Sequence, residues 1–148
     1  MVFAGEVPVW SVVPQNRVVA NKSDWDVVGA AEYVSLTTYR KDGTAVATPI
    51  WIAPSDGRLY FFSETKAWKV KRIGNNSDVT MQPCSVRGVI KQGSPIVEGS
   101  ARVLEFGDSA RVRKIMNKKY GLIARLSELG VRFFRPADFS LPIEIAPR

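Results

Sequence analysis

Two Asp-Gly pairs, Asp42-Gly43 and Asp56-Gly57, constrain the fold of this chain more than any other feature. Asp-Gly favours a β-hairpin because both residues accept the backbone angles of a tight turn. The segments around the two pairs are rich in β-branched and aromatic residues, which favour strands. These segments are 33–39, 44–53 and 58–63. The pattern predicts three strands joined as an antiparallel meander.

The rest of the 148-residue chain predicts further strands and three helices. Strands are expected at 79–84, 96–106 and 141–146, the last as an edge strand, and helices at 23–31, 67–74 and 108–130. Pro49 cannot donate to a ladder, which places it at an edge, at a bulge or facing a ligand. Gly99 indicates a bulge or a close backbone approach, and Gly121 a break or bend in the last helix. We expect a single, mainly β domain over 1–148: a six-stranded antiparallel barrel with flanking helices and an N-terminal arm at 1–22.

The absence of histidine and the single cysteine exclude several kinds of chemistry. Cys84 has no partner for an internal disulfide, and no zinc cluster can form from one cysteine without histidine. Without imidazole there is no Ser-His-Asp triad and no Cys-His pair. Any chemistry is therefore expected to come from a bound cofactor.

The formal net charge of +7 predicts an acidic partner, such as nucleic acid, an anionic membrane or a phosphorylated small molecule. The cations are dispersed along the sequence, and no motif for nucleic-acid recognition is present. No apolar run is long enough to span a bilayer, and the first residues lack the basic start of a signal peptide. We expect a cytoplasmic protein that binds a small anionic molecule and no nucleic acid.

The stretch 58–76 places hydroxyl groups and cations at a turn from a strand into a helix. The start of a helix favours anions because its first N–H groups are unpaired. On a helical wheel Val70 and Ile73 form the buried stripe, and Lys69 lies at its margin. Lys69 is therefore the cation best placed to reach a pocket, and a solvated basic helix is the alternative. Lys71 points towards water, and the other polar residues of the turn and helix are Ser63, Glu64, Thr65, Lys66, Lys69 and Arg72.

The order of these motifs resembles a known family. A strand, an Asp-Gly turn, TPIW, a second Asp-Gly turn, YFFSETKAWKVKRIGNN, a strand that ends in PC, and VEGSARVL follow one another. This order is similar to that of the pyridoxamine 5'-phosphate oxidase-like split β-barrel proteins. It is most similar to their actinobacterial branch, which uses the deazaflavin coenzyme F420. The resemblance covers about 32–106 and the closing PIEIAP.

The resemblance implies a set of cofactor-binding residues. In the family a lysine six residues before an asparagine contacts the cofactor phosphate, and Lys69 and Asn75 have this spacing. Phe62 and Ser63 occupy the positions of an aromatic side chain and a hydroxyl beside the ring and the phosphate. Arg87, in PCSVRG, is placed to reach the cofactor tail. The strand that offers backbone groups to the ring edge contains Thr48, Pro49, Ile50 and Trp51.

Two positions depart from the pyridoxamine phosphate oxidases proper. In those enzymes an Arg-Lys pair starts the helix and an arginine opens the second cofactor strand, whereas this chain has Trp68 and Thr48 there. The substrate-phosphate site of those enzymes also needs a histidine, which this chain lacks. The departures argue against tight binding of flavin mononucleotide (FMN) and against the vitamin-oxidase activity.

The resemblance implies a reductase that transfers a hydride between F420 and a small unsaturated or quinone-like acceptor. It also implies a homodimer with cofactor sites at the interface, for which Phe133, Phe134 and Arg135 are candidates. Alternatives are an FMN- or haem-binding split barrel and a non-catalytic barrel that sequesters the coenzyme.

Structural roles are the alternatives for several of these residues. Trp51 fits core or interface packing, and Cys84 fits a small buried residue. Glu64 is either a proton relay or a carboxylate that caps the turn, and Lys66 and Arg72 are either contacts or solvated cations. The basic residues of 108–130 are expected to form a solvated face: Arg111, Arg113, Lys114, Lys118 and Lys119.

Overall fold

The computed structural model describes residues 22–126 and 140–148. The predicted arm, apart from residue 22, and the predicted interface residues Phe133, Phe134 and Arg135 lie outside this part of the chain. The helices are α2 (Lys22–Ala30), α3 (Trp68–Asn75) and α4 (Ser109–Leu126), and a short 3-10 helix, η2 (Phe106–Asp108), precedes α4. The strands are β2 (Tyr33–Tyr39), β3 (Ala45–Ile50), β4 (Ala53–Ser55), β5 (Arg58–Glu64), β6 (Asp78–Cys84), β7 (Val97–Val103) and β8 (Ser140–Pro147).

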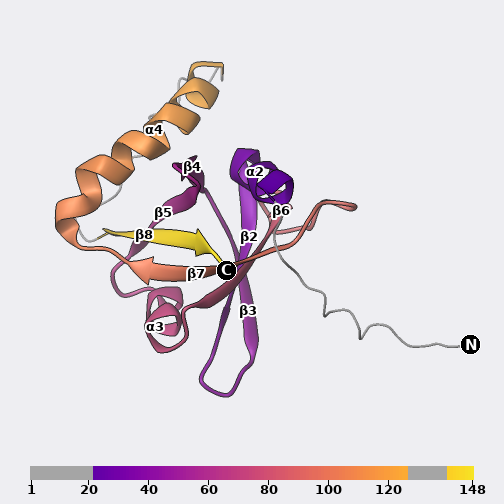
Figure 1. Cartoon of the computed structure of the whole chain (residues 1–148), viewed down its shortest axis with the longest axis vertical. Helices are drawn as coiled ribbons and strands as arrows, with labels where there is room; N and C mark the ends of the chain where they lie inside the picture. The colour runs from indigo at the N-terminus through magenta and orange to yellow at the C-terminus, as the bar shows by residue number, and fades with distance from the viewer. Residues whose placement is uncertain (1–21, 127–139) are drawn as a thin grey trace, which may run out of the picture.

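The seven strands form one antiparallel sheet in the order β3-β2-β6-β7-β8-β5-β4. The sheet curls on itself, with α2, α3 and α4 around it (Figure 1). This confirms the predicted mainly β split barrel with flanking helices, with seven strands in place of six. The two turns at Asp42-Gly43 and Asp56-Gly57 are also confirmed, and both glycines have positive φ, 91° and 80°.

The predicted three-strand meander is wrong, because its second strand is two strands. The segment 44–53 breaks at Trp51 and Ile52 into β3 and β4, which lie at opposite edges of the sheet. Each Asp-Gly turn therefore joins its own hairpin, β2-β3 or β4-β5. A chain that passes from one edge to the other in two residues brings the two edges together there, because two residues span only about 7 Å. The sheet is curled by this short crossing, and no pairing among the described strands joins β3 to β4.

Side chains of α4 hold the crossing in place. The Tyr120 hydroxyl accepts a hydrogen bond from the Ile52 N–H at 3.0 Å and lies 2.9 Å from the Ile52 carbonyl oxygen and 2.8 Å from that of Glu32. The Lys119 ammonium donates to the carbonyl oxygens of Gly29, Ala31 and Ile52 at 2.8, 2.6 and 2.5 Å. The prediction that Lys119 belongs to a solvated face is therefore wrong. The Lys119 side chain is half-buried because it supplies the donor that three carbonyl groups, at the end of α2 and at the crossing, need.

Strand β8 lies inside the sheet, between β7 and β5, so the predicted edge strand at 141–146 is wrong. The polar residue that makes the sequence of β8 alternate is Glu144, whose carboxylate is buried and does not mark a solvated edge. Glu144 is only 6 % exposed and accepts hydrogen bonds from Arg102, Arg58 and Tyr60 at 2.8, 3.0 and 3.0 Å. Burial acts to raise the pKa of the Glu144 carboxyl, but the hydrogen bonds from Arg102 and Tyr60 outweigh it and lower the pKa.

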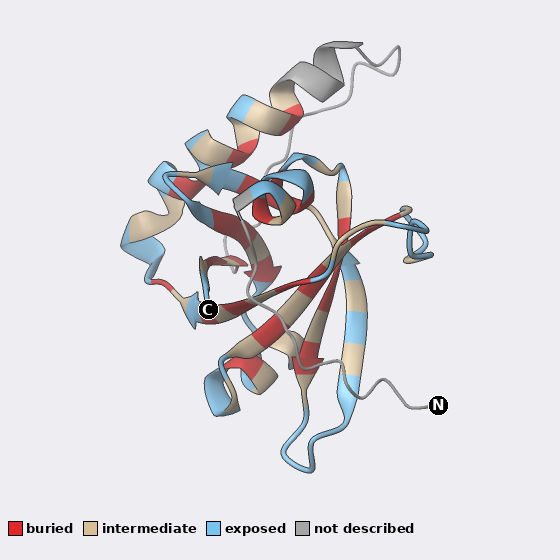
Figure 2. Cartoon of the chain, turned by 45° about the vertical axis from the view of Figure 1, so that its right-hand side comes forward, coloured by how far each residue is buried: buried red, intermediate tan, exposed pale blue. Residues whose placement is uncertain are grey.

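The buried side chains form two clusters, seen as the red bands along the strands in Figure 2. The larger cluster fills the inside of the curled sheet and includes Val34, Leu36, Phe61 and Ile143. The smaller one lies between α4 and the strands that it covers, and contains Ala53, Tyr60, Leu104, Val112, Met116 and Tyr120. Helix α4 continues through Gly121, where the sequence indicates a break or bend.

The long strand predicted at 96–106 is shorter than expected, because its end forms the 3-10 helix η2. Glu105 and Asp108 close a capping box at this point. The close backbone approach predicted at Gly99 is confirmed. A Cβ atom there would lie 2.5 Å from Ile145 Cγ2 and 2.9 Å from the Ala146 carbonyl oxygen, so only glycine lets β7 and β8 meet without a shift.

Candidate functional site

A cavity of about 480 Å³ lies where β5 turns into α3. Its lining residues come from the end of β3, the crossing, the end of β5 and the start of α3. They are Pro49, Ile50, Trp51, Phe62, Ser63, Glu64, Ala67 and Lys69. Seven of these eight belong to the cofactor residues that the sequence predicts, and Ala67 is the addition. The structure therefore brings the predicted strand and the predicted turn together around one space.

The cavity lies at the seam between the two edges of the sheet. Strand β4 pairs with β5 only from Arg58 to Tyr60, so no described strand pairs with the same edge of β5 from Phe61 onward. Strand β3 pairs with β2 on one side only, and its end faces the cavity from the other edge. The ends of β3 and β5 thus face the cavity from the two edges of the sheet. Pro49 lies on the edge strand β3 and is exposed, and an edge is one of the three positions that the sequence indicates for it.

Lys69 is the cation of the cavity wall. On a helical wheel Lys69 lies at the margin of the face that buries Ile73, and its side chain is half-buried beside the cavity. Burial, followed by the charge of Arg72, lowers the pKa of the Lys69 ammonium below its ordinary value of 10.5, and Glu64 acts in the opposite direction. A half-buried cation at the margin of an apolar space is held ready for an anion, because it has already lost part of its hydration.

Helix α3 begins at the same cavity. Its N-cap residue is Ala67, which has no side chain able to cap the first N–H groups. The partial positive charge of the helix start therefore faces the cavity together with Lys69. Ser63, buried at the end of β5, adds a hydroxyl, which is 3.5 Å from the Glu64 carbonyl oxygen. A ligand with one anionic group and an apolar remainder fits this set of side chains.

Trp51 has the packing role that the sequence indicated, and it also lines the cavity. Its ring stacks on Tyr120 with centroids 4.3 Å apart and planes 2° apart, and it meets Tyr33 edge-on at 6.2 Å. It packs against the smaller core cluster and also lines the cavity. The wall of the cavity therefore rests on α4 through Tyr120.

The other predicted site residues do not line the cavity. Thr48 lies on β3 opposite Leu36, and Lys66 is exposed in the turn before α3. Arg87 is exposed in the loop after β6, where the neighbouring Gly88 lies against Pro49. Arg87 is thus near the rim on the β3 side, while Thr48 and Lys66 are not part of the lining.

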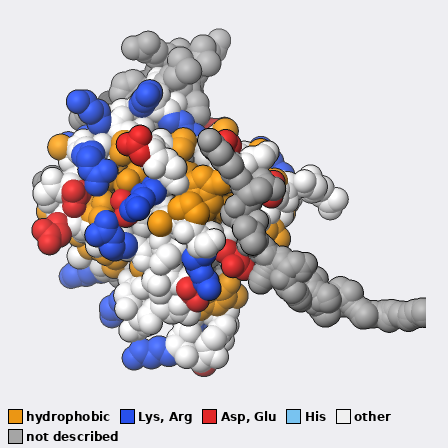
Figure 3. Space-filling view, in the orientation of Figure 1, with side chains coloured by type: hydrophobic (Ala, Val, Ile, Leu, Met, Phe, Trp, Pro, Cys, Tyr) orange, Lys and Arg blue, Asp and Glu red, His pale blue; other side chains and the backbone are white. Residues whose placement is uncertain are grey.

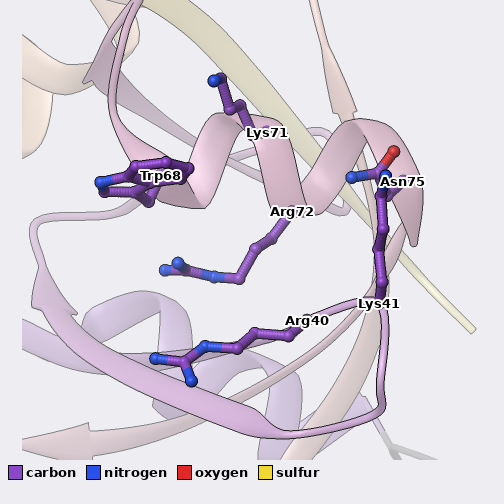
Figure 4. Close-up of a pocket in the computed structure, with 6 residues that line it drawn as sticks. All are labelled: Arg40, Lys41, Trp68, Lys71, Arg72 and Asn75. Carbon is purple, nitrogen blue, oxygen red and sulfur yellow. The ribbon is translucent and has the colours of Figure 1, made fainter.

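Arg72 and Asn75 line a different space on another face of α3. This second space, which we call the basic cleft, has a volume of about 590 Å³. It lies between α3 and the turn after β2, and Figure 4 shows its six lining residues: Arg40, Lys41, Trp68, Lys71, Arg72 and Asn75. The predicted pair Lys69 and Asn75 is therefore divided between the cavity and the basic cleft.

Sequence reasoning missed the basic cleft and the support from α4. The four cations of the cleft form two pairs, one on the turn after β2 and one on α3. About thirty residues separate the two pairs in the sequence, so only the fold brings them together. The spacing of Trp68, Lys71, Arg72 and Asn75 marks one face of a helix and offered a signal for this cluster. No sequence pattern indicated the roles of Lys119 and Tyr120, because their partners are backbone groups of α2 and of the crossing.

The described residues contain no group of three acidic or cysteine side chains arranged to hold a metal ion. Cys84 is buried, as predicted, and burial raises the pKa of its thiol, so it is a poor nucleophile.

None of the described helices has both the length and the apolar character required to cross a membrane. On the face of the molecule shown in Figure 3, Lys and Arg side chains are dispersed among acidic side chains and apolar surface.

A comparison with protein families finds that residues 26–137 match the family described as pyridoxamine 5'-phosphate oxidase. The chain belongs to this family. The split barrel, the seam cavity and the lysine at the start of α3 are thus features of a pyridoxamine 5'-phosphate oxidase-like protein. A comparison with curated protein sequences finds no match.

Solved structures of the same fold are described as proteins that bind different cofactors. One is described as an F420 reductase (23 % identity, TM-score 0.54, covering 83 % of this chain and 92 % of that one). A FAD-binding protein from Mesorhizobium loti is 19 % identical, with a TM-score of 0.57 and coverages of 86 % and 90 %. HutZ, a haem storage protein from Vibrio cholerae, is 13 % identical, with a TM-score of 0.58 and coverages of 86 % and 87 %. At these identities the likeness shows the fold, and the ligand must be argued from the cavity.

Proposed function

We propose that this protein is an F420-dependent oxidoreductase, which transfers a hydride between the deazaflavin coenzyme and a small unsaturated or quinone-like acceptor. The observation that carries the proposal is the cavity at the seam, where Lys69 and the start of α3 meet an apolar slot. The slot is formed by Pro49, Trp51 and Phe62. It suits a flat ring that is joined to an anionic group.

The charge of the cavity supports F420 over FMN. Lys69 is the one cation and Glu64 the one carboxylate among the described residues that line it. The phosphate of FMN is a monoester with a charge between −1 and −2 at neutral pH, which calls for several cations. F420 carries a phosphodiester, whose single negative charge one lysine and a helix start can balance, and glutamate-type carboxylates, which would lie outside the cavity because Lys69 is the one cation among its described lining residues. Trp68, at the position where the oxidases have an arginine, is turned into the basic cleft and adds no charge to the cavity.

The described residues would bind and orient the coenzyme, which when bound supplies the hydride. Lys69 and the N–H groups at the start of α3 would hold the phosphodiester. The end of β3, on the cavity wall, would offer backbone groups to the rim of the ring. Trp51, fixed by its stack on Tyr120, would exclude water from one side and keep the ring at a constant depth. Glu64 is exposed, and solvent can deliver the proton that accompanies the transfer.

The same proposal includes a homodimer, in which each subunit completes the site of its partner, and a small-molecule acceptor in the cytoplasm. A cavity on a seam between two edges is open to solvent on one side. A second subunit that covers it would complete the wall, and the acceptor would enter beside the ring.

A ligand titration tests the proposal. The full chain is titrated separately with F420, FMN and haem, and binding is followed by quenching of coenzyme fluorescence or by the change in absorbance. We expect F420 to bind about tenfold more tightly than FMN, because a second negative charge beside Glu64 costs about 1.4 kcal/mol or more. Preference for FMN or haem would contradict the assignment and would favour the flavin- or haem-binding alternative.

Turnover separates an enzyme from a carrier. Reduced F420 and the protein are mixed with a panel of enones and quinones, and oxidation of the coenzyme is followed by its absorbance. Tight F420 binding without oxidation by any acceptor would identify a barrel that sequesters the coenzyme.

A further inference from the structure

The basic cleft collects four cationic residues on one side of the molecule. Arg40 and Lys41 lie on the turn after β2, and Lys71 and Arg72 lie on α3. The turn is well defined, because the Arg40 N–H donates to the Thr44 carbonyl and the Gly43 N–H donates to the Arg40 carbonyl, both at 2.9 Å. Helix α3 is tied to the same strand, since Arg72 Nε donates to Thr38 Oγ1 at 2.6 Å. The four cations are thus held beside one another by two rigid elements.

These charges repel one another without a carboxylate between them. The charge of Arg40 lowers the pKa of Arg72, after the effect of burial. The residues that line the cleft include no acid, and no salt bridge between described residues involves any of the four cations. Asp42 is next to the cleft, and hydrogen bonds from Thr44 and, to a smaller extent, the charge of Arg40 lower the pKa of its carboxyl. It therefore offsets part of the charge of Arg40 and leaves the other three cations without an acid among the described lining residues. A cluster of like charges is electrostatically unfavourable without a bound counter-ion, and a multivalent anion in the cleft would relieve the repulsion.

An exposed indole forms one wall of the cleft. Trp68 is 70 % exposed, although burial of its ring would be favourable. The Lys71 ammonium lies over the ring at 4.8 Å from its centroid, which orients the indole beside the charges. In Figure 4 the guanidinium groups of Arg40 and Arg72 extend to the same side, with the indole above them in that view. The cleft therefore offers donors for oxygen anions and a flat surface for a ring.

We propose that the basic cleft is a second binding site, for an organic oligophosphate that carries a flat ring, such as a nucleoside triphosphate. The two guanidinium groups suit phosphate oxygens, which they bind with paired hydrogen bonds, and the ammonium groups add charge. Trp68 stacks on the ring. The site is on a different face of α3 from Lys69, so it does not depend on the proposed function of the cavity.

The test uses the full chain and ATP without metal as the probe. Calorimetry gives the affinity, and the change in tryptophan fluorescence on binding is compared between the unsubstituted protein and Trp68→Ala, because Trp68 is one of four tryptophans. ATP should bind at least about fivefold more tightly than inorganic tripolyphosphate, because stacking on one aromatic ring is worth about 1–3 kcal/mol per base. Adenosine alone should bind too weakly to detect. A tripolyphosphate affinity equal to that of ATP would overturn the role of Trp68. Tighter binding of an oligo-γ-glutamate peptide would overturn the assignment to phosphate.

Matched variants locate the site. Arg40→Gln with Lys71→Gln should weaken ATP binding by roughly tenfold or more, because two charged hydrogen-bond donors are lost. Lys114→Gln with Lys118→Gln removes the same charge from exposed positions of α4 and should change the affinity by less than about twofold. Equal losses in both double variants would overturn the site in favour of general attraction to the net charge.

Amide chemical shifts of the unsubstituted protein give a test that does not depend on how a variant folds. ATP should shift the signals of Arg40, Lys41, Trp68, Lys71, Arg72 and Asn75. Shifts centred on Lys69, Ser63 and Phe62 would place ATP in the cavity and overturn the second site.

Discussion

Two faces of the same short helix, α3, show opposite ways to present positive charge. The seam cavity has one cation, Lys69, half-buried beside aromatic rings and a single carboxylate. The basic cleft has four cations and an exposed indole. A half-buried cation is specific for an anion of matching charge, because burial makes any mismatch costly. Solvated cations bind in proportion to the charge of the ligand and are weakened by salt. The difference teaches that one short helix can present charge in two environments, and our two proposals assign a different kind of anion to each.

The strongest test of this comparison is Lys69→Ala. The affinity for F420 should fall by about 10- to 150-fold, which corresponds to about 1.5–3 kcal/mol for a charged hydrogen bond. Affinity of the basic cleft for ATP should stay unchanged. Calorimetry with each ligand measures both constants, and Lys66→Ala is the matched control because Lys66 is exposed outside the cavity. A retained F420 affinity would remove Lys69 from the site.

The seam cavity, unlike the cleft, depends on α4, and Tyr120→Phe tests this dependence. The ring still stacks on Trp51, but the hydroxyl that meets Ile52 and Glu32 is lost. The free energy of unfolding should fall by about 1–2 kcal/mol, because the buried Ile52 N–H is left without an acceptor. F420 affinity should fall with it, while ATP affinity should not. Urea unfolding followed by fluorescence gives the stability, and an unchanged midpoint would contradict the support from α4.

Trp68→Ala should have a smaller effect, and only in the basic cleft. We expect ATP affinity to fall about fivefold, the lower end of base stacking, with F420 affinity unchanged. The variant keeps all four cations, so it separates stacking from charge. Isothermal titration with both ligands is the measurement. A fall in F420 affinity would show that the two faces of α3 are coupled.

The alkaline limit of binding sharpens the comparison with the smallest change. Burial lowers the pKa of Lys69, so it loses its proton at a lower pH than an ordinary lysine. F420 affinity should therefore decline as the pH rises, beginning below 10.5, the ordinary value. Lys69→Arg keeps its charge and should remove this decline. Lys69→Arg should leave the pH dependence of ATP binding in the basic cleft as it is in the unsubstituted protein, and a decline of F420 affinity that persists in Lys69→Arg would assign it to another group.

The sequence predicted the elements of the fold better than their pairing. Strands near the Asp-Gly turns and the helix with Lys69 at its margin follow from local backbone and side-chain preferences. The break at Trp51 and Ile52 was missed because a continuous apolar run has no local sign of a strand end. The position of β8 was missed because Glu144 alternates with apolar residues as a solvated residue would, although Arg58, Arg102 and Tyr60 bury it.

The same limit applies to the site. Residues close together in the sequence, such as Phe62, Ser63 and Lys69, were placed correctly beside one space. Arg72 was expected near the same turn as Lys69, and the resemblance paired Lys69 with Asn75 by spacing, but a helix turns by about 100° per residue and carries Arg72 and Asn75 to another face. Lys119 was missed because its partners are carbonyl groups, which a sequence does not display.

The two-residue crossing between β3 and β4 has a consequence for the width of the seam. One end of the seam is closed by peptide bonds through Trp51 and Ile52, and not by a ladder that can slip or open. The gap available to a ligand is therefore set by chain length. A single residue inserted between Trp51 and Ile52 would let the edges move apart by up to about 3.5 Å, which is the thickness of an aromatic ring, and would widen the seam by that amount.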